Sequence, residues 1–161
     1  MGLSAHQSAH MDTDVWLTPP EILAPLGEFD LDPCACITQH WVPARRVFFK
    51  SDDGLVQDWF GRVWMNPPFG RAVGDWLKKL ADHGNGIALV AARTETEWFV
   101  SQVWKRANAV LFIHGRPHFY YPSGVRAKFN SGAPIALIAY GCNNVLSLQN
   151  SGLGTMVQWW K

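Results

Sequence analysis

The chain has 161 residues, of which 48% are hydrophobic and 17% are charged, and its formal net charge is +1. This length fits one domain that buries a sizeable core, and the near-neutral charge excludes a uniformly basic surface. No segment approaches the roughly 20 apolar residues that a membrane span needs, so we expect no membrane partner.

The run 18–21 indicates the start of a short helix. Thr18 is the expected N-cap, Pro19 occupies the first helical position, and Glu21 closes a capping box. Pro25 keeps this helix short, because proline is not tolerated deep inside one.

Alternation of apolar and acidic residues predicts a strand at 29–32, and short, mostly apolar stretches predict further strands at 46–49, 62–65, 86–91, 109–113 and 134–140. The run 86–91 is nearly continuous, which is typical of a strand buried on both faces of a parallel sheet. Apolar residues at helical spacing predict a helix over 71–81, and a capping box at 94–97 opens a second helix that ends near residue 105.

Alternation of buried strands with helices predicts an α/β domain with a mostly parallel sheet and helices on both faces. Ligands in such folds lie at the carboxyl ends of strands. Asp32, Asn66 and Arg93 each follow a predicted strand. We therefore expect one crevice to collect all three.

The cysteines Cys34, Cys36 and Cys142 are odd in number and have apolar neighbours, which is typical of reduced thiols in an intracellular protein. A Cys34-x-Cys36 pair without a second pair is too little for zinc. We therefore expect a cytoplasmic protein without a metal site.

The stretch Asn66-Pro67-Pro68-Phe69 says most about chemistry. Its two prolines keep the chain out of helix and sheet, so a stiff loop presents a polar side chain and two carbonyl groups. The Asn66 side-chain oxygen and the Pro67 carbonyl can each accept one N–H of an amine on a planar ring, and Phe69 can stack on that ring. An ordinary Pro-Pro turn with a buried Phe is the structural alternative.

Three elements follow one another in a fixed order: Thr18-Pro19-Pro20, Asp32-Pro33-Cys34-Ala35 and Asn66-Pro67-Pro68-Phe69. Together they resemble the amino-methyltransferases that use S-adenosylmethionine. The stretch from Trp16 to Gly141 is similar to the small phage-type, Dam-like DNA N6-adenine methyltransferases.

The resemblance implies a single Rossmann-like methyltransferase domain of reduced size over residues 15–161, after a flexible N-terminus at 1–14. The length leaves no room for a separate target-recognition domain. The implied activity is methyl transfer to the N6 amine of adenine in DNA, after the base is flipped out of the duplex. A phage gene would place the enzyme in the cytoplasm of a bacterial host.

The resemblance also implies a set of site residues. The catalytic set is Asn66, Pro67, Pro68 and Phe69. The residues expected to bind S-adenosylmethionine are Trp16, Thr18, Pro19, Asp32, Pro33, Cys34, Ala35, Asp52 and Asp53. Which aspartate of the 52–53 pair holds the ribose or the adenine of the cofactor stays open.

Two departures from the family pattern concern the cofactor. The loop after Asp32 is not glycine-rich, and no acid lies between Asp32 and Asp52, so the usual second strand and its helix must be shortened. A turn cap at Asp32 and an Asx-turn before Gly54 are structural alternatives for these aspartates.

Candidate DNA contacts are basic residues, namely Arg45, Arg46, Arg71, Arg93, Arg116, Arg126 and Lys128. Residues 115–131 form a loop rich in His, Arg and aromatic side chains that can enter a groove or fill the gap left by the base. Its alternative is a solvated β-hairpin with Pro122-Ser123-Gly124 at the turn. Trp159-Trp160 either closes the fold or marks a partner surface.

Two other readings remain open. The same loop chemistry suits methylation of an RNA adenine or a protein glutamine, and the fold also suits a non-catalytic binding module. Sequence does not predict the recognised DNA site or the oligomeric state.

Overall fold

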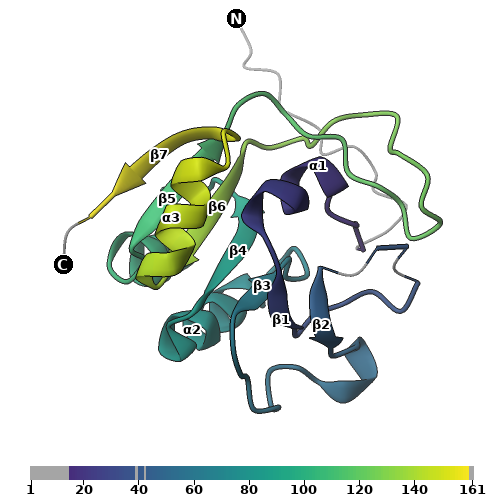
Figure 1. The fold of residues 1–161 in the computed structure, drawn as a ribbon, viewed down its shortest axis with the longest axis horizontal. Coiled ribbons are helices and arrows are strands. Elements are labelled where there is room, and N and C mark those ends of the chain that lie inside the picture. The colour runs from purple at the N-terminus through teal and green to yellow at the C-terminus, as the bar shows by residue number, and fades with distance from the viewer. Residues whose placement is uncertain (1–14, 39, 42, 160–161) are drawn as a thin grey trace, which may run out of the picture.

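The computed structural model describes residues 15–38, 40–41 and 43–159. The expected flexible segment 1–14 and Trp160 lie outside these ranges. A seven-stranded sheet forms the centre of the domain, with the strand order β2-β1-β3-β4-β6-β5-β7 (Figure 1). The strands are β1 (Phe29–Asp32), β2 (Ala44–Val47), β3 (Val63–Met65), β4 (Gly86–Ala91), β5 (Ala109–Ile113), β6 (Ile135–Tyr140) and β7 (Gly154–Gln158).

Helices connect these strands and cover the sheet. They are α1 (Pro20–Leu23), the 3-10 turns η1 (Ala24–Leu26) and η2 (Lys50–Asp52), α2 (Val73–His83), the π-helical η3 (Phe99–Trp104) and α3 (Cys142–Asn150). The predicted α/β class is confirmed.

The predicted mostly parallel sheet is not confirmed. β2, β1, β3 and β4 pair in parallel, whereas the ladders β4–β6, β6–β5 and β5–β7 are antiparallel. β6 lies between β4 and β5 and runs against both. An apolar run predicts burial but not strand direction, so the sequence pattern did not reveal the reversal.

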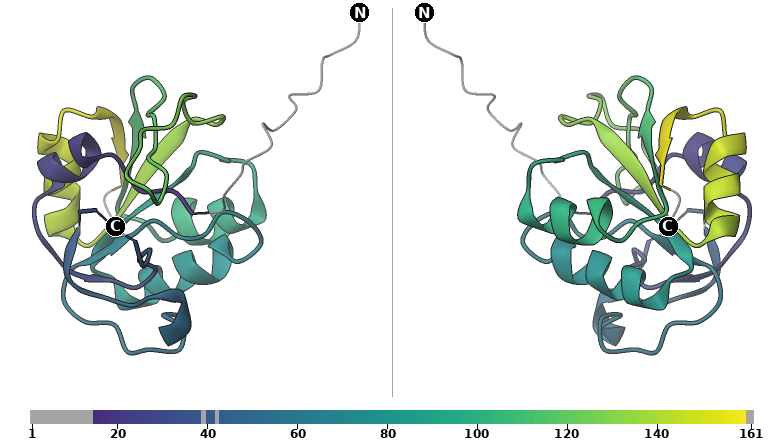
Figure 2. Two further views of the ribbon diagram at one scale, coloured as in Figure 1. Left: turned by 90° about the vertical axis from the view of Figure 1, so that its right-hand side faces the viewer. Right: turned by 90° about the vertical axis from the view of Figure 1, so that its left-hand side faces the viewer.

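Side chains alternate between two cores, one on each face of the sheet. Val63 and Met65 of β3 pack with α2 and η3, while Trp64 between them packs with η1 and α3 on the opposite face. The two layers of helices are visible on either side of the sheet in Figure 2. The expected coverage of both faces follows from this alternation.

The predicted N-cap at Thr18 is wrong by one residue. The helix begins at Pro20, and Pro19 is its N-cap with an extended ψ of 137° and no side-chain cap bond. A residue that precedes proline is pushed into extended backbone, so Pro19 cannot be the first helical residue. The Thr18 hydroxyl is thereby left for other contacts.

The second predicted capping box does not form either. Trp98 precedes η3 without a side-chain cap, and the Thr96 hydroxyl donates to the Arg93 carbonyl oxygen at 2.8 Å instead. This local turn delays the start of the helix and competes with capping.

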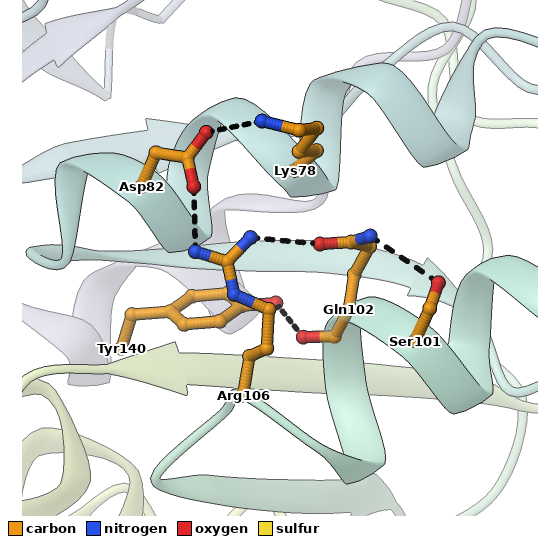
Figure 3. A network of polar contacts seen from close by, with 6 residues as sticks. All are labelled: Lys78, Asp82, Ser101, Gln102, Arg106 and Tyr140. Carbon is orange, nitrogen blue, oxygen red and sulfur yellow. Dashed lines mark hydrogen bonds and ion pairs between the residues drawn. The ribbon is translucent and has the colours of Figure 1, made fainter.

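A polar network holds η3 against α2 and β6 (Figure 3). Asp82 accepts from Lys78 at 2.7 Å and from Arg106 at 2.6 Å, and Arg106 donates to the Gln102 side chain at 3.0 Å. The Tyr140 hydroxyl donates to the Gln102 carbonyl oxygen at 2.8 Å, and burial raises the pKa of this hydroxyl. The phenol therefore stays neutral and acts as a donor.

The end of the described chain closes the fold. Trp159 donates its backbone N–H to the Asn108 carbonyl oxygen at 3.2 Å, and its ring meets Trp104 edge to face at 5.4 Å between centroids. Of the two alternatives for the final tryptophan pair, Trp159 thus takes a packing role.

Candidate active site

A cavity of about 710 Å³ lies where β1 and β3 end, and its wall comes entirely from residues between Val15 and Trp76. Among the predicted site residues it is lined by Trp16, Thr18, Asp32, Pro33, Cys34, Ala35, Asp53, Asn66, Pro67, Pro68 and Phe69. The volume suits a small-molecule or cofactor site. Pro19 and Asp52 are not part of this wall.

The Asn66 side chain is held in one orientation. Its Nδ2 donates to the Trp16 carbonyl oxygen at 2.8 Å. Because a carbonyl oxygen only accepts, this bond requires the NH₂ group on that side and the oxygen on the other. The Asn66 Oδ1 atom is shielded from solvent and has no hydrogen-bond partner among the described residues. Leaving a buried acceptor unpaired costs about 1–3 kcal/mol.

Two loops meet at Cys34. Asp32, only 3% exposed, accepts the Cys34 backbone N–H at 3.1 Å, and the Cys34 thiol donates to the Asn66 carbonyl oxygen at 3.3 Å. Burial, with the nearby Asp32 charge second, raises the pKa of this thiol. Cys34 is therefore a neutral donor that ties the loop after β1 to the loop after β3.

The neighbouring aspartates have different surroundings. The Asp52 carboxylate accepts the Phe49 backbone N–H at 2.7 Å and so caps the turn η2. Asp53 lines the cavity and adopts a left-handed φ of 50°. Asp52 therefore has a local role, but as a cap of η2 and not in the Asx-turn before Gly54 that was the alternative, while Asp53 lines the cavity.

The backbone at Gly54 packs closely against Pro33 in the loop after β1. A Cβ atom at Gly54 would lie only 2.0 Å from the Pro33 carbonyl oxygen. Glycine is required at this approach because any side chain would collide with backbone.

The segment 16–18 forms one wall of the cavity and is held in place by Tyr120 and Trp41. Leu17 and Tyr120 exchange two backbone hydrogen bonds, at 2.9 and 3.1 Å, and the Trp41 indole donates to the Thr18 carbonyl oxygen at 2.9 Å. The Thr18 hydroxyl itself is buried and has no partner in the part of the chain that the structure describes.

Several wall residues were missed by sequence reasoning, including Cys36, Trp41, Lys50 and Ser51. Lys50 and Ser51 directly precede the predicted Asp52-Asp53 pair, and this proximity is a usable signal. Trp41 carries no local signal, because only the folded chain brings it to Thr18.

The predicted DNA contacts lie outside the cavity wall, and all seven are exposed. Arg45 pairs with Glu28 at 2.7 Å, and the Arg116 guanidinium donates to the Gly132 carbonyl oxygen at 2.8 Å. The guanidinium of Arg46 lies over Phe48, and the Lys128 ammonium lies over Phe129. Arg71, Arg93 and Arg126 complete this exposed set.

The expected crevice shared by Asp32, Asn66 and Arg93 is therefore wrong for its third member. A tight turn follows β4, in which the Arg93 N–H donates to the Ala91 carbonyl oxygen at 2.8 Å. Arg93 lies beyond this turn, so it does not reach the cavity wall.

The loop between β5 and β6 contains a hairpin, which we define as residues 119–127. The Tyr121 carbonyl oxygen accepts the Gly124 N–H at 2.8 Å, and the Tyr121 N–H donates to the Val125 carbonyl oxygen, also at 2.8 Å. Gly124 has a positive φ of 80°. The backbone of this segment thus forms the β-hairpin that the sequence pattern predicted as the alternative, with Pro122-Ser123-Gly124 at the turn.

Within residues 15–38, 40–41 and 43–159, no group of three or more His, Cys, Asp and Glu side chains is arranged to hold a metal ion. The helices of the same ranges are all too short or too polar to cross a membrane.

The model of the family described as DNA N-6-adenine-methyltransferase (Dam) matches residues 6–141. Searches of curated proteins and of solved structures gave no match.

Proposed function

We propose, since the chain belongs to the DNA N-6-adenine-methyltransferase (Dam) family, that it transfers a methyl group from S-adenosylmethionine to the N6 amine of adenine in DNA. The observation that carries this proposal is the Asn66 amide, whose Oδ1 is shielded from water and unpaired among the described residues while its Nδ2 is bound to the Trp16 carbonyl oxygen. Such a fixed acceptor matches an amine that enters the cavity. A Rossmann-like domain is the architecture we infer for it.

The proposed chemistry needs two acceptors. Asn66 Oδ1 and the Pro67 carbonyl oxygen each accept one N–H of the amine, which favours a tetrahedral nitrogen whose lone pair is no longer delocalised into the ring. S-adenosylmethionine supplies an activated methyl group on sulfur. A nitrogen–carbon bond forms as the sulfur–carbon bond breaks, and the extra proton on nitrogen passes to water. Adenine must leave the duplex to reach this loop.

The cofactor is assigned to the polar groups of the wall other than Asn66. The Thr18 hydroxyl is buried without a partner among the described residues, so a bound ligand can satisfy it, and the buried Asp32 is the acid of the neighbouring loop. We assign the ribose or adenine contact to Asp53, because Asp52 already caps η2.

The two aspartates provide a matched pair of variants. Asp53→Asn is expected to weaken S-adenosylmethionine binding about 10-fold, as expected when a charge-assisted hydrogen bond is lost. Asp52→Asn keeps an oxygen that can accept the Phe49 N–H, so it should leave both stability and affinity for the cofactor nearly unchanged. Calorimetric titration of both variants measures this, and equal affinities would reject the assignment.

DNA binding is assigned to the seven exposed basic residues, of which Arg126 and Lys128 lie on or beside the hairpin. Each phosphate contact releases counterions, so affinity should fall as salt rises. Replacing Arg126 or Lys128 should lower affinity for duplexes of any sequence to a similar extent and reduce the slope of this salt dependence by about one per contact.

The function is tested with labelled cofactor and three acceptors: duplex DNA, RNA and a glutamine peptide. Label in the N6 position of DNA adenine is expected, and label in the peptide alone would reject the proposal. A parallel melting experiment addresses the binding-module reading. S-adenosylmethionine should raise the melting temperature, since a ligand that binds only the native state stabilises it.

A further inference from the structure

Besides the Asn66 oxygen and the Thr18 hydroxyl, a third unpaired atom belongs to the residues of the cavity wall. Trp16 Nε1 is shielded from solvent and has no hydrogen-bond partner within the described ranges. An indole N–H is only a donor, and hydrogen-bonding groups that are buried usually have partners. Apart from the Thr18 hydroxyl, the wall therefore holds one fixed acceptor, Asn66 Oδ1, and one fixed donor, Trp16 Nε1, that both lack a partner among the described residues.

Trp16 is anchored beside the Asn66 amide from two directions. Its carbonyl oxygen accepts Asn66 Nδ2 at 2.8 Å, and its ring packs on Tyr121 of the hairpin with 5.0 Å between centroids. Its chain neighbour Leu17 is paired with Tyr120. These contacts hold the indole in place on the side of Asn66 where the hairpin lies.

Adenine presents the complementary pattern. Its N6 amine is a donor, and the ring nitrogens on either side of the amine, N1 and N7, are acceptors. An amine bound to Asn66 Oδ1 therefore carries an acceptor right beside it. We propose that the Trp16 indole N–H donates to the ring nitrogen next to the amine of the target adenine, and so positions the base for transfer. This inference rests on the proposed function.

The main competitor is a contact between the same N–H and the cofactor, which the sequence pattern suggested for Trp16. The bond between the Trp16 carbonyl and the Asn66 amide favours the substrate, because it places this residue beside the group that receives the amine. The two roles differ in which ligand loses affinity when the N–H is removed.

The test uses Trp16→Phe together with duplexes that carry adenine, 1-deazaadenine or 7-deazaadenine at the methylated position. Both analogues keep the amine and replace one ring nitrogen by C–H. Trp104→Phe is the matched control, because its indole N–H bonds the Thr94 carbonyl oxygen at 3.0 Å and the residue does not line the cavity. A benzothienylalanine at position 16, which keeps the shape and lacks the N–H, serves if Trp16→Phe does not fold.

Removing one neutral hydrogen bond should lower kcat/KM on adenine about three- to tenfold in Trp16→Phe. One of the two analogues should show a similar or larger loss with the wild-type protein and little further loss with Trp16→Phe, since both partners are then apolar. Cofactor affinity should stay within about twofold of the wild type, and Trp104→Phe should discriminate the analogues as the wild type does.

Other outcomes overturn the inference. Losses on both analogues that are the same in wild type and Trp16→Phe would show that the indole donates to neither ring nitrogen. If Trp16→Phe lowers cofactor affinity but does not change the ratio of activities on adenine and its analogues, the indole N–H binds the cofactor and not the base. Failure of the wild type to methylate plain adenine in DNA would instead reject the proposed function, and this inference with it.

Discussion

The parallel and antiparallel halves of the sheet differ in the length of their strand pairing and in whether they contribute to the cavity. In the parallel half, β1 and β3 share a single paired position, whereas β4 and β6 in the antiparallel half are paired at six. The whole cavity wall comes from residues between Val15 and Trp76, before β4 begins. The half that holds the candidate site is thus the half with the shorter ladders.

The unpaired buried atoms follow the same division. Trp16 Nε1, Thr18 Oγ1 and Asn66 Oδ1 all belong to the cavity wall, and Ser131 Oγ is the one other such atom in the described chain. In the antiparallel half, every residue of β6 is buried. A domain stabilised by the burial of apolar side chains can tolerate a site whose buried polar groups have no partner until a ligand binds. Unpaired buried groups of this kind are expected mainly at functional sites.

The largest expected effect tests the site half. Asn66→Ala removes the proposed amine acceptor and the bond to the Trp16 carbonyl, so turnover should fall by at least about 100-fold, as when one transition-state hydrogen bond is lost. Affinity for S-adenosylmethionine should stay within a few fold. Methyl-transfer assays and calorimetry on the folded variant measure the two quantities, and a matching collapse of cofactor affinity would contradict the assigned role.

Asn144→Ala is the control for this variant. Asn144 is fully buried at the base of α3, where it donates to the Tyr140 carbonyl oxygen at 2.7 Å and accepts from Arg62 at 2.6 Å. Its loss should lower stability and leave turnover per folded molecule intact.

Leu137→Ala tests the scaffold half. Leu137 of β6 is 0% exposed within the core that α3 covers. Truncating a buried leucine typically costs about 2–5 kcal/mol of unfolding free energy. Denaturant unfolding should show a loss in this range, while kcat near the wild-type value at low temperature would confirm that this half acts as support. A large fall in kcat of the folded variant would break the division between the halves.

The sequence predicted strand bounds best where the pattern of apolar residues is regular along the whole strand. The runs 29–32, 86–91 and 109–113 became β1, β4 and β5 to the residue. β7 was not predicted, because its residues are half exposed at the sheet edge and owe their conformation to pairing with β5. α3 was also missed, since the Asn143-Asn144 pair and Ser147 have weak helix propensity.

The site shows the same limit. Asp32 is the last residue of β1 and Asn66 directly follows β3, both in the parallel half, so they were expected together, and both line the cavity. Neither the choice between Asp52 and Asp53 nor the approach of Trp41 can be read locally. The first depends on a left-handed φ at Asp53, and the second on a contact across 23 positions of the chain.

A smaller effect is expected at Phe69, which lines the cavity and is partly exposed. If the ring stacks on the base, Phe69→Ala should cost about 1–3 kcal/mol in kcat/KM, and Phe69→Trp should retain most activity because a larger ring also stacks. Steady-state kinetics on one duplex compares them. Equal damage from both substitutions would point to packing within the wall.

The smallest expected effect concerns the two ion pairs of Asp82, one with Lys78 within α2 and one with Arg106 just after η3. Hydrogen bonds from Lys78 and Arg106 lower the pKa of Asp82 below its usual 3.8. A lowered folded-state pKa gives stability that is present above the unfolded pKa and is lost as the pH falls through the folded value. Because the Asp82 side chain is 50% exposed, screening limits this contribution to less than about 1 kcal/mol.

Asp82→Asn should therefore be slightly less stable than the wild type near neutral pH, with a difference that shrinks as the pH drops below 3.8. Denaturant midpoints across this range measure it, and exposed Asp58, changed to Asn, controls for the loss of one charge. Turnover should not change, because the Asp82 network fastens η3 to α2 and reaches no residue of the cavity wall. A change in turnover would mean that the scaffold helices and the site are coupled after all.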